Sequence, residues 1–75
     1  MSYRIVDHDT KHTIETHVGP MSAFRAMLVL SAHEVKNGRK PNYRVEPPVF
    51  YRLEEVSPPL APWVLEALEV GREPR

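Results

Sequence analysis

Residues 42–56 read NYRVEPPVFYRLEEV, and apolar side chains occupy every second position from Tyr43 to Leu53. This period of two is typical of a β-strand with one buried face. Two adjacent prolines, Pro47 and Pro48, interrupt the pattern, and proline cannot donate a hydrogen bond to a neighbouring strand. Because edge strands tolerate proline, the stretch predicts an edge strand with a bulge or kink near residue 47.

The N-terminal stretch predicts a β-hairpin that turns at residues 9–10, where Asp and Thr separate two alternating runs. We expect a register with Ile5 opposite Ile14 and Arg4 opposite Glu15, because apolar pairs and opposite charges stabilise neighbouring strands. One face of the hairpin then bears Tyr3, Ile5, Ile14, Thr16 and Val18, and the other bears Arg4, Val6, His8, Thr13, Glu15 and His17.

The stretch between the hairpin and the proline strand predicts the first helix. Ser22 can cap its start through its hydroxyl group, and Gly38 suits a left-handed C-terminal cap. On a helical wheel one side carries charges together with a single apolar residue, Val29. The stripe that we expect to cover the sheet contains Phe24, Met27, Leu28, Ser31 and Val35, widened by Ala23 and Leu30.

The C-terminal part predicts a stiff linker followed by a short helix. Prolines in SPPLAP, residues 57–62, oppose regular structure, and the helix is expected to begin near Pro62 and to end before Gly71. Apolar residues cover most of its circumference. We expect it to fold back over Val6 and Phe50 on the far face of the sheet; the alternative is an exposed apolar patch.

Together these elements predict an α+β fold in the order β-β-α-β-α. The most economical topology is a three-stranded antiparallel sheet in the order 2-1-3, with one helix packed on one face and a short C-terminal helix. We expect residues 1–57 to form the hairpin–helix–strand core, and residues 58–75 to form a proline-rich linker and helix that belong to the same domain.

The composition fits one small domain in a reducing compartment. The chain of 75 residues is 41% hydrophobic and has no cysteine, which excludes disulfides and thiolate metal sites and favours the cytoplasm. No apolar run approaches the ~20 residues of a membrane span, and the N-terminus lacks the apolar core of a signal peptide. We therefore expect a cytoplasmic protein without a membrane partner.

Charge is unevenly distributed although the formal net charge is zero. Residues 25–44 hold five basic groups against one acidic group, whereas residues 45–75 hold three basic groups against six acidic groups. A neutral chain exerts little overall attraction on nucleic acid, so any contact with phosphates would have to come from the basic segment.

The titratable side chains do not suggest an enzyme. His8, His12 and His17 crowd the hairpin with Asp7 and Asp9, and a metal site or an acid–base pair is one interpretation of them. Such residues near a turn are more often simply solvated, and we adopt that interpretation. The glycines stand singly and form no phosphate-binding loop. We expect no catalytic residues, no cofactor and no metal.

We interpret the protein as a non-enzymatic protein-binding module that docks on a larger protein or nucleoprotein complex. The leftover apolar residues of the sheet and of the last helix favour an interface. The layout of residues 3–54 resembles small proteins encoded by phages and mobile elements, some of which inhibit host defence or transcription, and this resemblance implies an inhibitor or adaptor. The predicted partner-binding residues are Arg25, Val29, Lys36, Arg39, Lys40, Phe50, Trp63 and Leu68.

Two alternatives remain open at this point. The basic segment Lys36–Arg44 could bind nucleic acid, with Tyr43 as a stacking group. The chain could instead form a homodimer that closes the C-terminal helix against a twin.

Overall fold

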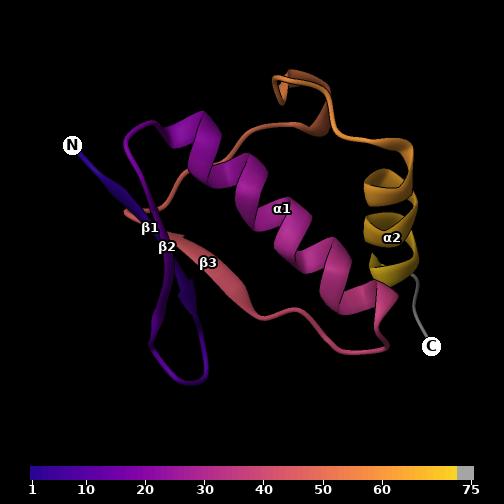
Figure 1. Ribbon diagram of the computed structural model, residues 1–75. Coiled ribbons are helices and arrows are strands. Elements are labelled where there is room, and N and C mark those ends of the chain that lie inside the picture. Colours follow the sequence, from indigo (N-terminus) through magenta and orange to yellow (C-terminus); the bar gives the residue numbers. More distant parts are fainter. Residues whose placement is uncertain (73–75) are drawn as a thin grey trace.

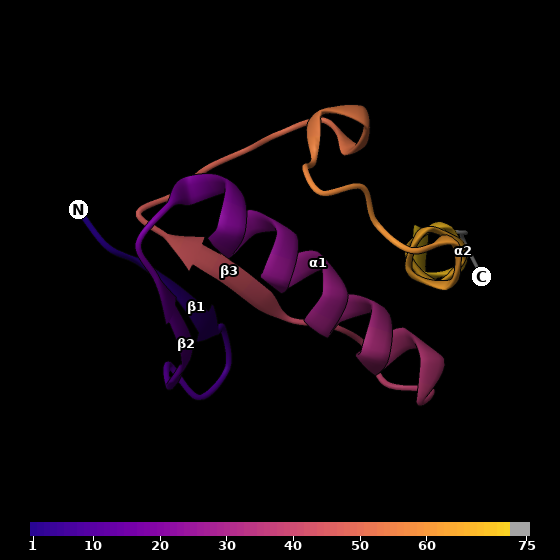
Figure 2. The same cartoon turned by 45° about the horizontal axis from the view of Figure 1, so that its top comes forward.

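The computed structural model describes residues 1–72 and has the predicted order of elements (Figure 1). The elements are β1 Tyr3–Asp7, β2 Thr13–His17, α1 Pro20–Lys36, β3 Tyr43–Glu46, a 3₁₀ turn Leu53–Glu55 and α2 Pro62–Arg72. The three strands form an antiparallel sheet in the order β2-β1-β3, which confirms the predicted α+β topology and the position of β3 at an edge. Helix α1 lies between the sheet and α2 (Figure 2).

The first core lies between the sheet and α1. Ile5 of β1 and Val45 of β3 stand opposite each other in the register and are buried with Ala23 of α1. Tyr3 and Tyr43 pack around them. The period of two therefore predicted correctly which face of β1 and β3 meets the helix.

The predicted hairpin register holds only near the turn. There Val6 pairs with Thr13, and the N–H of Asp7 donates to the carbonyl of His12. Beyond this point the register shifts by one residue, so Ile5 faces Glu15, and the predicted pairing of Ile5 with Ile14 is wrong.

The shift is a β-bulge, which gives β2 one extra residue. Ile14 has no partner across the strand pair and is 44% exposed, and Arg4 faces Thr16 instead of Glu15. The shift also moves His17 to the α1 side of the sheet, where a hydrogen bond of 2.7 Å joins its Nδ1 to Oγ of Ser22.

The hairpin turn is built without glycine. The Asp7 carboxylate accepts hydrogen bonds from the backbone N–H groups of Asp9 and Thr10, at 2.9 and 3.1 Å. Lys11 adopts the left-handed conformation, with φ of 66°. The Asp7 carboxylate thus stabilises the turn through its hydrogen bonds, and Lys11 takes the positive φ that glycine often supplies.

Helix α1 begins earlier than predicted and ends where predicted. Gly19 is the N-cap and Pro20 the first helical residue, so Ser22 lies inside the first turn and is not the cap. At the other end Gly38 has φ of 74°, its N–H donates to Val35 and the N–H of Arg39 donates to Glu34. These two bonds form a Schellman motif.

The proline strand is shorter than predicted. Strand β3 ends at Glu46, and the bond between Glu46 and Pro47 is cis. The expected break near residue 47 is confirmed, but no paired strand follows it, and residues 47–52 run without strand pairing to the 3₁₀ turn. Leu53, expected on the buried face, is 37% exposed.

The second core lies between α1 and α2. Its buried residues are Phe24 and Ala32 of α1, Val56 and Leu60 of the linker, and Val64 of α2. The expectation that the last helix covers Val6 and Phe50 is therefore wrong.

This second core explains two features of the sequence. Val29, the apolar residue among charges, packs against the cluster. Gly71 lies inside α2 and not beyond its end, and a Cβ there would stand 3.0 Å from Cγ2 of Val35. The glycine lets the two helices approach closely.

No helix in residues 1–72 combines the length and the apolar character needed to cross a bilayer.

Candidate docking site

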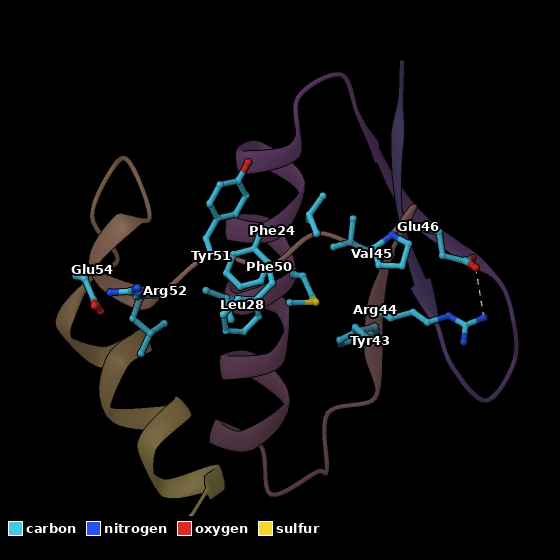
Figure 3. Close-up of a pocket in the computed structure, with 14 residues that line it drawn as sticks. Phe24, Leu28, Tyr43, Arg44, Val45, Glu46, Phe50, Tyr51, Arg52 and Glu54 are labelled. Carbon is cyan, nitrogen blue, oxygen red and sulfur yellow. Dashed lines mark ion pairs between the residues drawn. The ribbon is translucent and has the colours of Figure 1, made fainter.

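An open groove of about 740 Å³ lies beside β3 (Figure 3). Its floor is formed by Phe24, Met27 and Leu28 of α1, one wall by β3 and the other by residues 48–54. Phe24 and Leu28 belong to the stripe that was expected to cover the sheet. The sheet packs on Ala23, Met27 and Leu30 of this stripe and on Ala26, so Phe24 and Leu28 are left between the sheet and α2.

Phe50 stands over this floor and is 84% exposed. Its ring meets Phe24 edge to face, with 6.1 Å between the centroids and 71° between the ring planes. Tyr51 makes a second edge-to-face contact with Phe24 at 5.6 Å. One phenylalanine of α1 thus holds two aromatic rings of the crossing segment, in the geometry that aromatic quadrupoles favour. A largely uncovered phenylalanine beside an apolar floor is a feature of interaction sites.

Charges of both signs lie on the face of β3 that points away from α1. Nη2 of Arg44 lies 3.4 Å from Oε2 of Glu46, and Nη2 of Arg4 lies 3.7 Å from Oε1 of the same carboxylate. Arg44 also lies 3.1 Å from Nδ1 of His8. All these side chains are partly exposed, so the pairs contribute little to stability.

Glu34 anchors the start of β3 to the end of α1. Its carboxylate pairs with the Arg39 guanidinium and accepts a hydrogen bond of 2.8 Å from the Tyr43 hydroxyl. The hydrogen bond from Arg39, followed by that from Tyr43, holds the pKa of Glu34 below its ordinary value of 4.5. The same bond to Glu34, together with burial, raises the pKa of Tyr43 above its ordinary value of 10.0.

Three predicted site residues gather at the seam between α1 and α2. Nζ of Lys36 lies 5.2 Å from the centre of the Trp63 ring, and the His33 ring lies 4.8 Å from Trp63. Leu68 packs against the second core. Trp63 and Leu68 are therefore engaged within the chain, and the structure separates them from Phe50.

The predicted basic residues are dispersed. Nε of Arg25 donates to the carbonyl of Pro58 at 2.9 Å and fastens the linker to α1. Arg39 pairs with Glu34, and Arg44 pairs with Glu46. Within residues 1–72, Lys40 makes no ion pair. These cations do not form one continuous surface of unpaired charges.

The histidines of the hairpin have separate environments. His17 bonds to Ser22 and, through Nε2, to Glu15 at 2.8 Å, whereas His8 bonds to Arg44. Among the described residues no group of three His, Asp or Glu side chains is placed to hold a metal ion.

Sequence reasoning identified Phe50 but missed the residues around it. Phe24 and Leu28 were assigned to the sheet interface, and Tyr51 to the buried face of a longer strand. The signal that could have located the groove is the pair of prolines at 47 and 48, because ending the strand there frees residues 48–54 to cross α1.

No family model, no curated protein and no solved structure matches the chain.

Proposed function

We propose that the protein is a small non-enzymatic protein-binding module, an accessory or inhibitor protein that docks on a larger protein or nucleoprotein complex through the groove beside β3. The observation that supports this proposal is Phe50, which is 84% exposed over an apolar floor. Burying such a side chain against a partner removes apolar surface from water and contributes ~1.5–3 kcal/mol to association.

The surroundings of Phe50 suit an interface. Charged residues of both signs surround the apolar floor, namely Arg44, Glu46, Arg52 and Glu54. An apolar centre within a polar rim is the usual anatomy of a protein–protein contact. The aromatic contacts to Phe24 hold the Phe50 ring in place, so less conformational entropy is lost when a partner binds.

Nucleic-acid binding by Lys36–Arg44 is the alternative. Ion pairs with Glu34 and Glu46 already engage Arg39 and Arg44, which reduces the charge available for phosphates. Replacing Arg39 and Lys40 by glutamate distinguishes the two functions, because only a nucleic-acid complex would be lost with a steep dependence on salt.

The proposal is tested by capture from a lysate of the source organism, with a matched pair of variants. Phe50→Ser removes the exposed ring, whereas Val18→Ser changes an apolar residue that is 86% exposed and lies outside the groove. We expect mass spectrometry to find one partner that the wild type and Val18→Ser retain and Phe50→Ser loses. Equal retention by all three proteins would contradict the proposal.

A further inference from the structure

The outer edge of β3 carries backbone groups that the sheet leaves unused. The N–H of His8 donates to the carbonyl of Asn42, which makes these residues a hydrogen-bonded pair of the antiparallel ladder. Such pairs alternate along a ladder, so Arg44 and Glu46 bond to β1 in the same way. The N–H and C=O groups of Tyr43 and Val45 therefore point away from β1.

Within residues 1–72 these outward groups make no backbone bond to another segment. A row of unpaired groups at a sheet edge is a template for an added strand.

The groove has the position that a fourth strand needs. It runs along β3, and its floor is the face of α1 that the sheet leaves uncovered, with Phe24 and Leu28 visible there in Figure 3. A strand added at this edge would turn alternate side chains toward α1, as Val45 does. These side chains should be apolar.

The charged residues of β3 indicate which residues the added strand should carry between its apolar positions. Arg44 and Glu46 flank Val45 on the other face, with side-chain exposures of 43% and 35%. Opposite charges directly across a strand pair are stabilising, and like charges are destabilising. An antiparallel strand should therefore place a basic residue opposite Glu46, an apolar residue opposite Val45 and an acidic residue opposite Arg44.

We propose that the groove binds an extended segment of a partner protein, which adds to β3 as an antiparallel fourth strand and carries the order basic, apolar, acidic, apolar. This inference rests on the proposed function and names the binding mode and the chemistry of the partner. The antiparallel direction follows from the sheet, which is antiparallel throughout, and from the slightly greater stability of antiparallel pairs.

The probe is a synthetic peptide, Thr-Lys-Val-Glu-Val-Thr, with both ends blocked. Its control, Thr-Glu-Val-Lys-Val-Thr, has the same composition but sets like charges against Glu46 and Arg44. We expect the control to bind about tenfold more weakly in an NMR titration. Binding should slow hydrogen exchange at the amides of Tyr43 and Val45 and leave the amides of Arg44 and Glu46, already bonded to β1, unchanged.

A second pair of peptides tests the backbone contact. Methylating the nitrogen of the first valine removes the N–H that would donate to Val45, whereas methylating the glutamate nitrogen alters an N–H that points away from β3. We expect the first change to abolish binding and the second to preserve it. Equal binding of the two methylated peptides, or no slowing at Tyr43 and Val45, would overturn the inference.

A second copy of the chain is the competing occupant, because Arg44, Val45 and Glu46 themselves read basic, apolar, acidic. Protection of Tyr43 and Val45 that appears without peptide and rises with protein concentration would overturn the inference in favour of a dimer. If the peptides fail but Phe50→Ser still loses the captured partner, the binding mode is wrong and the proposed function stands.

Discussion

At the scale of single residues, Phe24 has a central role. It is buried in the core shared with α2, and its ring also meets Phe50 and Tyr51. Phe24 therefore belongs both to the core and to the groove. A change at Phe24 would disturb folding and binding together, whereas a change at the exposed Phe50 separates them, which is why Phe50 is the residue to test.

The contact between Tyr43 and Glu34 predicts a dependence of stability on pH. Glu34 has a lowered pKa in the folded protein, so its contribution is present above pH 4.5 and is lost as the pH falls through the folded value. Tyr43 has a raised pKa, so its contribution is present below pH 10.0 and is lost as the pH rises through the folded value.

Tyr43→Phe tests this dependence. The ring stays and the hydroxyl is lost, so we expect a lower free energy of unfolding at pH 7 and a higher Glu34 pKa. The difference from wild type should shrink below the pKa of Glu34. Urea unfolding at several pH values and an NMR titration of Glu34 measure both effects, and a difference that stays constant down to pH 2 would contradict the assignment.

The conformation of Lys11 predicts that a glycine at this position would stabilise the protein. Its left-handed φ of 66° is unfavourable for a residue with a Cβ. We expect Lys11→Gly to raise the free energy of unfolding by about 0.5–1 kcal/mol, since relief of the strain exceeds the added entropy of the unfolded chain. Lys11→Ala, which keeps a Cβ, is the control. Urea unfolding that finds glycine no better than alanine would show that the turn is not strained.

At the scale of elements, α1 is a helix with two packed sides. Ala23 and Leu30 face the sheet, while Val29 and Ala32 face α2 and the linker. The sequence predicted one packed side for this helix, so the centre of its apolar stripe was expected to lie against the sheet. With packing on both sides, part of that stripe becomes the groove floor.

Because α2 packs on α1, truncating two valines of α2 should lower the free energy of unfolding by different amounts. Val64 is 2% exposed and Val70 is 46% exposed. We expect Val64→Ala to lower the free energy of unfolding by about 2 kcal/mol through lost burial and a small cavity, and Val70→Ala to change it by less than about 0.5 kcal/mol. Similar losses at both positions in chemical denaturation would contradict the packing of α2 described above.

At the scale of the whole molecule, the two cores share Met27 and Val49, which pack against both. We therefore expect residues 1–72 to unfold as one cooperative unit. The single tryptophan, Trp63, reports on the seam between the helices, and far-ultraviolet circular dichroism reports on all elements. The two urea transitions should coincide. A fluorescence transition at lower urea would show instead that α2 detaches first.

The sequence by itself determined the order of elements, the edge position of β3 and the face of β1 and β3 that meets α1. These features follow from periodicity along short stretches and from prolines that exclude a strand from the centre of a sheet. Only the tertiary structure decided the bulge at Ile14, the docking of α2 on α1 and the groove under Phe50. The bulge changes the pairing within the hairpin, which the alternating pattern of β2 does not reveal. The docking of α2 and the groove depend on contacts between segments far apart in the chain, and a helix that is apolar nearly all round does not specify which surface it covers.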